Sequence, residues 1–92
     1  MTTKTLSPYA SILKTALRVS DEDAKRVEVL CRWWHGTLDS LTERELQREG
    51  AIQLEALQVS REDAKNQDHH DFAQEARNML ARLEIEAGLA SA

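Results

Sequence analysis

Apolar residues recur along this chain at intervals of three and four, the spacing that places side chains on one face of an α-helix. The pattern predicts helices over residues 8–18, 21–35, 43–58 and 72–87. The first two stripes consist of Tyr9, Ile12, Leu13, Ala16 and Leu17, and of Ala24, Val27, Leu30, Cys31 and Trp34. The last two consist of Leu46, Gly50, Ile52, Leu54 and Leu57, and of Phe72, Ala73, Ala76, Met79, Leu80, Leu83 and Ala87. Each stripe is expected to face a common core.

Residues that favour helix ends lie at the borders of these segments. Ser7, Ser20 and Thr42 each stand where an N-cap is needed, and Thr42 opens a Thr-x-x-Glu capping box. Gly36 and Gly88 follow the second and the last stripe, where a left-handed residue ends a helix. Short corners between helices are therefore expected.

Two segments leave more than one interpretation open. Gly50 costs about 1 kcal/mol relative to Ala inside a helix, and we favour a continuous helix with a bend or a close helix contact there. Residues 65–71 are all polar. They form either the solvated first turns of a helix that begins after Ser60, or a break after which Asp68 caps a new helix.

An internal repeat accompanies two of the caps. Residues 16–25 read ALRVSDEDAK and residues 56–65 read ALQVSREDAK, eight identities in ten. One interpretation is a chain of two helix hairpins, each with a Val-Ser corner. The plainer interpretation is that efficient caps look alike.

Composition supports an all-α fold. Ala, Glu, Lys, Leu and Arg supply half of the 92 residues, and one Pro and three Gly interrupt them. Val and Ile are too few for a sandwich or barrel. We predict a single helical domain over residues 1–92, a bundle of four helices (five if residues 65–71 break) with fraying ends at residues 1–6 and 89–92.

The net charge is −4. Residues 1–40 carry six cations and five acids, whereas residues 41–92 carry six cations and eleven acids, a net −5. An acidic chain is repelled by nucleic acids and anionic membranes unless its cations cluster. No apolar run is long enough for a membrane span or signal peptide, and Cys31 has no disulfide partner, so we expect a cytoplasmic protein.

The Val-Ser corners also suggest a second function, a dimeric DNA-binding regulator of helix-turn-helix type. The groove-facing cations would be Lys25 and Arg26 after the first corner, and Arg61 and Lys65 after the second. Acids begin both candidate recognition helices, which argues against contact with phosphates. A DNA-binding chain should gather its cations into one exposed stripe.

Metal binding and catalysis have little support in the sequence. Cys31 lies one helical turn from His35, and His69 and His70 stand together, but a structural zinc site needs four ligands at paired spacings. No nucleotide-binding or paired-carboxylate motif accompanies Cys31. We expect no enzyme activity, no metal and no cofactor.

Adjacent tryptophans at positions 33 and 34 point about 100° apart on a helix, so one of them must leave the core stripe. In the simpler interpretation Trp34 is buried, and Trp33 lies at the bundle edge against the first or last helix with its N–H reaching toward solvent. In the alternative Trp33 anchors a protein interface together with Arg32 and His35, because Trp and Arg dominate interface energetics.

A non-enzymatic protein-binding module, such as an adaptor, regulator or inhibitor, is therefore the predicted function. An acidic face would suit a cationic groove, for instance the nucleic-acid channel of a larger machine, as small inhibitors encoded by mobile elements do. The acids expected on this face are Glu43, Glu45, Glu49, Glu55, Glu62 and Asp63.

A homodimer is expected, either through the last helix or through the edge that carries Trp33. The candidate dimer row of the last helix consists of Phe72, Ala76, Met79 and Leu83, flanked by charged residues as in self-pairing helices. The alternative is that this row closes the four-helix core.

Overall fold

A computed structural model describes residues 6–90, and all regular structure in this range is helical. Helix α1 spans Pro8–Leu17, α2 spans Asp21–His35, α3 spans Glu43–Ala64 and α4 spans His70–Glu86. The prediction of four helices packed together is confirmed. Residues 1–5 and 91–92, which belong to the predicted fraying ends, lie outside the described range.

The predicted N-caps of the first three helices form. The hydroxyl groups of Ser7 and Ser20 each accept a hydrogen bond of 3.1 Å from the backbone N–H three residues further on. Thr42 and Glu45 complete the capping box, with bonds of 3.1 and 2.8 Å between side chains and backbone. These bonds join neighbours in the sequence, which is why the pattern of residues located them.

The second Val-Ser corner does not form. Helix α3 passes through Gly50, as predicted, and continues through Val59 and Ser60 to Ala64, so the prediction that Ser60 caps a new helix is wrong. Buried Leu57 and an ion pair of 2.6 Å between Arg61 and Asp23 hold this stretch against α4 and α2. Tertiary contacts here outweigh the capping preference of one serine. Helices α1 and α2, and α3 and α4, still pack as two pairs, but the second pair turns at residues 65–69 and not at a Val-Ser corner.

The break before the last helix lies at residues 65–69. The side-chain oxygen of Asn66 accepts hydrogen bonds from the N–H groups of Asp68 and His69, at 2.9 and 3.3 Å. This is the local turn that Asn commonly forms. Helix α4 then begins at His70 without a side-chain cap, so the prediction that Asp68 caps it is wrong.

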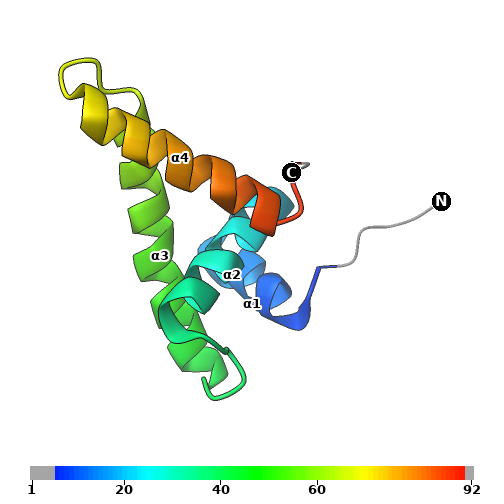
Figure 1. The fold of residues 1–92 in the computed structure, drawn as a ribbon. Coiled ribbons are helices and arrows are strands. Elements are labelled where there is room, and N and C mark those ends of the chain that lie inside the picture. Colours follow the sequence, from blue (N-terminus) through cyan, green and yellow to red (C-terminus); the bar gives the residue numbers. More distant parts are fainter. Residues whose placement is uncertain (1–5, 91–92) are drawn as a thin grey trace.

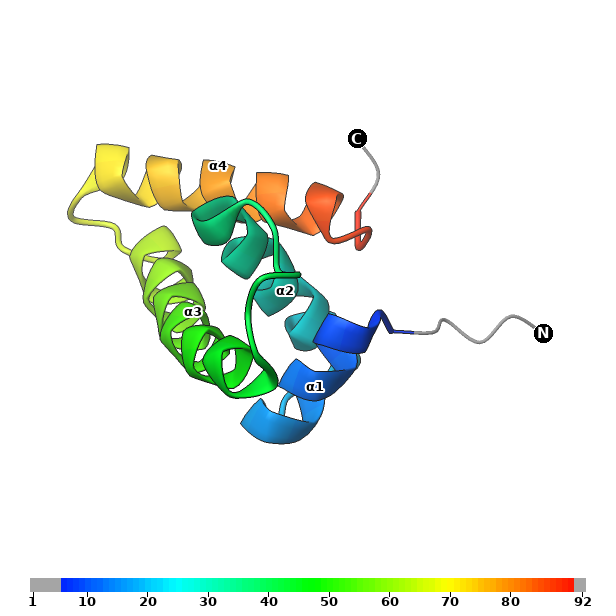
Figure 2. The ribbon, with the colours of Figure 1, turned by 90° about the horizontal axis from the view of Figure 1, so that it is seen from below.

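Helix α2 is the central element. It packs against α1, α3 and α4, and it lies in the angle between α3 and α4, with α1 on the side away from the turn at residues 65–69 (Figures 1 and 2). Every helix and the loop between α2 and α3 contribute to the core. The largest fully buried side chains are Leu13, Val27, Cys31, Leu38, Leu57 and Leu83.

Four residues of the predicted core stripes are instead exposed: Ala16, Trp34, Ile52 and Phe72. Trp34 is 75% exposed because it lies in the last turn of α2, where neighbouring helices no longer cover its side of the helix. Ile52 is 56% exposed because the core face of α3 is set by Gly50, and a residue two positions further on points about 200° away. Spacing alone could not show where the covering helices end.

None of the described helices combines the length and the apolar character needed to cross a membrane.

Four charged residues join α2, α3 and α4 in one ion-pair network. Asp23 accepts hydrogen bonds from Arg26 at 2.7 Å and from Arg61 at 2.6 Å, and Arg26 also pairs with both carboxylate oxygens of Glu84. Arg61 and then Arg26 lower the pKa of Asp23, and Arg26 lowers the pKa of Glu84. The network therefore stabilises the fold while both carboxylates are ionised.

We expect the free energy of unfolding to fall as the pH drops below about 4. The pKa values of both carboxylates are lower in the folded protein than in the unfolded chain. Their contribution to stability is therefore present above the unfolded-state pKa and is lost as the pH falls through the folded-state pKa. At pH 7 the double variant Asp23→Asn, Glu84→Gln should have a free energy of unfolding about 1–3 kcal/mol lower than that of the wild type. In urea titrations its free energy of unfolding should also change less between pH 7 and pH 3. Glu75→Gln, on the exposed side of α4, is the control. If the free energy of unfolding depended on pH as strongly in the double variant as in the wild type, the stabilising role of the network would be contradicted.

Gly50 marks the close helix contact that the sequence suggested. A Cβ atom at position 50 would overlap a methyl carbon of Leu13, which is fully buried in α1. The absence of a side chain at Gly50 therefore lets α1 and α3 approach.

Gly50→Ala should destabilise the protein by about 1–3 kcal/mol, the usual effect of overpacking a core. The sign of the change in stability is informative, because replacing Gly by Ala at an exposed helix position would add about 1 kcal/mol of stability. Urea unfolding curves measure the difference. A stability equal to or above that of the wild type would show that Leu13 moves aside without cost.

Candidate functional site

The two tryptophans end α2 in different surroundings. The indole N–H of Trp33 donates a hydrogen bond of 2.7 Å to Glu86, and the Arg82 guanidinium lies 5.1 Å from the centre of a Trp33 ring. Trp33 is thus 37% exposed and lies at the bundle edge against α4, as the simpler interpretation predicted. Trp34 has the larger free aromatic surface.

Both residues predicted to act with Trp33 have partners within the chain. Arg32 pairs with Glu28, a carboxylate only 6% exposed that also accepts a hydrogen bond of 2.8 Å from Ser7. His35 lies 3.2 Å from a carboxylate oxygen of Glu49 on α3. These contacts give Arg32 and His35 a structural role at the ends of α1 and α3.

The solvent face of α3 carries an apolar row that the sequence pattern did not identify. Ile52 and Val59 are 56% and 54% exposed, and exposed Ala56 lies between them at the i, i+4, i+7 spacing of a helix face. We call these three residues the α3 stripe. The spacing is visible in the sequence, but the pattern places Ile52 in the core and Val59 at a corner.

Acidic residues surround the α3 stripe. The charged positions three or four residues from its members are Arg48, Glu49, Glu55, Glu62 and Asp63. One cation against four acids gives a local net charge of −3. A hydrogen bond from Gln53 and the neighbouring His35 lower the pKa of Glu49, so this carboxylate is ionised at neutral pH.

The acids of the predicted acidic face are spread along α3 and do not form one compact surface. Glu49, Glu62 and Asp63 flank the α3 stripe, whereas Glu43 and Glu45 stand in the first turn of the helix. From Glu45 to Glu62 the helix rises about 26 Å. Glu45 is also part of the capping box, where hydrogen bonds with Thr42 lower its pKa.

The candidate dimer row on α4 splits between core and surface. Leu83 is fully buried and Met79 packs against the core, as the alternative interpretation predicted. Ala76 is half-buried, and Phe72 is 53% exposed near the start of α4. Phe72 is therefore the large side chain of this row that remains open to a partner.

The cations of the described helices are mostly paired rather than gathered. Arg26 and Arg61 belong to the ion-pair network, Arg82 pairs with Glu86 at 2.8 Å and Lys14 pairs with Asp21 at 2.6 Å. These four side chains are therefore held by carboxylates of the chain, whereas a DNA-binding helix presents free cations to phosphates.

The two proposed recognition helices also differ from a groove-reading helix. Because α3 continues through Ser60, Lys65 follows the end of α3 instead of beginning a new helix, and Asn66 and Gln67 lie in the turn. The first corner does form, but α2 after it is packed against three helices, and Lys25 is half-buried.

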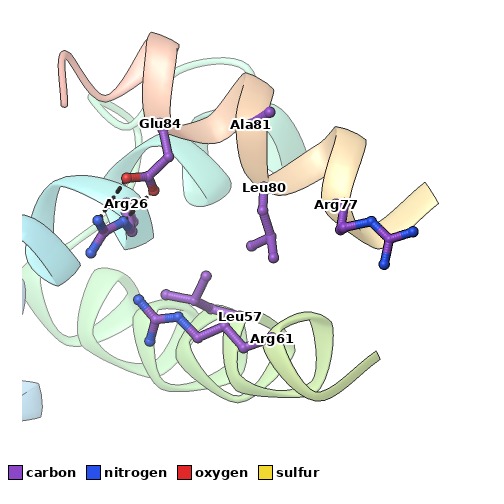
Figure 3. Close-up of a pocket in the computed structure, with 7 residues that line it drawn as sticks. All are labelled: Arg26, Leu57, Arg61, Arg77, Leu80, Ala81 and Glu84. Atoms are coloured by element: carbon purple, nitrogen blue, oxygen red, sulfur yellow. Dashed lines mark hydrogen bonds and ion pairs between the residues drawn. The ribbon is translucent and has the colours of Figure 1, made fainter. Parts of the chain in front are cut away.

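A cleft of about 400 Å³ lies between α3 and α4, on the other side of α3 from the α3 stripe. In Figure 3, Leu57 and Leu80 point toward each other across it, the Arg26–Glu84 pair closes one end and Arg77 stands at the other. The lining residues are Arg26, Leu57, Arg61, Arg77, Leu80, Ala81 and Glu84. The cleft thus combines an apolar interior with a cationic rim.

Cys31 is enclosed in the core, whereas His35 is exposed at the end of the same helix. Burial, with the negative charges of Glu49 and Glu28, raises the pKa of the Cys31 thiol to about 12. The thiolate is the nucleophilic form of cysteine, so Cys31 lacks the features of a catalytic nucleophile. In the described part of the chain, no three His, Cys, Asp or Glu side chains are grouped to hold a metal ion.

Cys31 should react with a thiol reagent at pH 8 far more slowly in the folded protein than in urea, because burial excludes the reagent and the raised pKa keeps the thiol protonated. Absorbance of the released thiolate after addition of Ellman's reagent measures both rates. Rapid labelling of the folded protein would show that the core around Cys31 opens.

Comparison of the chain with models of known protein families, with curated proteins and with solved structures finds no match. Its function therefore has to be argued from its own side chains.

Proposed function

We propose that this protein is a non-enzymatic interaction module that binds a protein partner through the solvent face of α3. The observation that carries the proposal is the α3 stripe, in which Ile52 and Val59 are each more than half exposed among mainly acidic neighbours. The complementary partner surface is an apolar groove flanked by Lys and Arg side chains.

The α3 stripe suits recognition in which a helix enters a groove. Helix α3 has 22 residues, a length of about 33 Å, and its side chains at i, i+4 and i+7 are the usual anchors in this mode. Leu46, Gly50 and Leu57 fix the opposite face of α3 in the core. Because the helix is already formed, binding loses little conformational entropy.

The acids beside the α3 stripe favour a cationic partner and disfavour other partners. Carboxylates steer association with a cationic surface and repel nucleic acid, anionic lipid and the same face of a second copy. A protein groove that ordinarily holds a nucleic acid carries cations of this kind. The module would inhibit such a protein by occupying the groove.

A homodimer through α4 has less surface to use. Leu83 is buried and Met79 packs on the core, so Phe72 is the main exposed apolar side chain of that row. One side chain falls well short of the roughly 800 Å² per partner that a stable interface buries. The α3 face is therefore the interaction surface that we favour.

Two synthetic amphipathic helical peptides test the proposal, one with lysines and one with glutamates beside the same leucine stripe. We expect the lysine peptide to bind, with an affinity that falls at high salt, and the glutamate peptide not to bind. The double variant Ile52→Ser, Val59→Ser should weaken binding at least tenfold, because each aliphatic side chain contributes about 1.5 kcal/mol or more when buried. Calorimetric titration gives the affinities.

Phe72→Ser is the matched control, because it removes a similarly exposed apolar side chain from another surface. It should leave peptide binding unchanged. Equal binding by the stripe variant and the wild type would show that the attraction is charge alone and would overturn the proposal. Salt-dependent binding of the wild type to random duplex DNA would favour the DNA-binding alternative.

A further inference from the structure

We propose that the cleft between α3 and α4 binds a small amphipathic carboxylate, an alkyl chain that ends in one negative charge. The cleft has a volume of about 400 Å³, within the range of small-molecule sites. It lies away from the α3 stripe, so the inference does not depend on the proposed function.

The interior of the cleft suits an alkyl chain. Leu57 of α3 and Leu80 of α4 face each other across it (Figure 3), and Ala81 is a further lining residue. An apolar chain placed between these side chains would exchange water for hydrocarbon contacts.

Arg77 suits the charged end. Its guanidinium donates to the backbone carbonyl of Ala64 at 2.9 Å and to the side-chain oxygen of Gln74 at 3.1 Å, both neutral acceptors. Among residues 6–90 no carboxylate lies within ion-pair distance of Arg77. A guanidinium has five N–H donors in a planar fork, so Arg77 can still receive a carboxylate.

Charge in and around the cleft favours a ligand with one negative charge. Three guanidinium groups lie against two carboxylates, because Arg26 and Arg61 share Asp23, and Glu84 pairs with Arg26. One positive charge, that of Arg77, is left over. A phosphate monoester carries close to two negative charges at neutral pH, which exceeds the one positive charge of Arg77.

A chain-length series tests this site. Butanoate, hexanoate and octanoate are titrated into the isotope-labelled protein at pH 7, and amide chemical shifts are followed by NMR. We expect affinity to rise by up to about fourfold for each buried methylene, as the transfer free energy of one CH₂ implies. The shifts should concentrate at residues 57–61 and 77–84. Octanol, which has the chain without the charge, should bind much more weakly.

Arg77→Gln should weaken octanoate binding about tenfold, the effect of one charge-assisted hydrogen bond. Arg82→Gln, which removes the same charge from another side of α4, is the matched control and should keep wild-type affinity. The inference is overturned if octanol binds as tightly as octanoate, if Arg77→Gln binds like the wild type, or if the shifts are spread over the molecule.

Discussion

Two polar side-chain contacts, one near each end of α2, fix how α3 lies beside it. Asp23 pairs with Arg61 near one end, and His35 pairs with Glu49 at the other. The paired positions are twelve residues apart on both helices, about 18 Å, so the two helices run antiparallel in one register. Any corner within residues 49–61 would break this match. The rest of the structure depends on α3 being straight over that length, because α1 and α4 both pack against it.

This requirement explains where sequence reasoning succeeded and where it did not. Caps at Ser7, Ser20 and Thr42 are local and were predicted from neighbouring residues. Ser60 lies in nearly the same local sequence as Ser20, yet it is inside a helix because distant partners hold α3 there. The difference between the two serines is tertiary, and a single sequence does not contain the partner of each segment.

In the candidate site, too, local features could be predicted from the sequence and features that depend on tertiary contacts could not. The acids near α3 were recognised from composition, but Ile52 and Val59 were missed because their exposure depends on which side of α3 meets the core. Gly50 settles that side through its contact with Leu13. The cleft was beyond prediction for a related reason, since Leu57 and Leu80 face each other only after α4 turns back along α3. One helix thus separates an acidic surface from a cleft with a cationic rim.

The two halves of α4 each have one fully buried side chain, Ala73 and Leu83, but differ in their polar contacts. Its C-terminal half is fastened to α2 by Glu84 and Glu86, which bind Arg26 and Trp33. Its first turn has no side-chain cap and carries the exposed Phe72. Local opening of a protein starts where buried contacts are few. Helix α4 will therefore unravel from residue 70 inward while its far end stays attached, which makes its first turns the part of the helix where backbone amides exchange with solvent soonest.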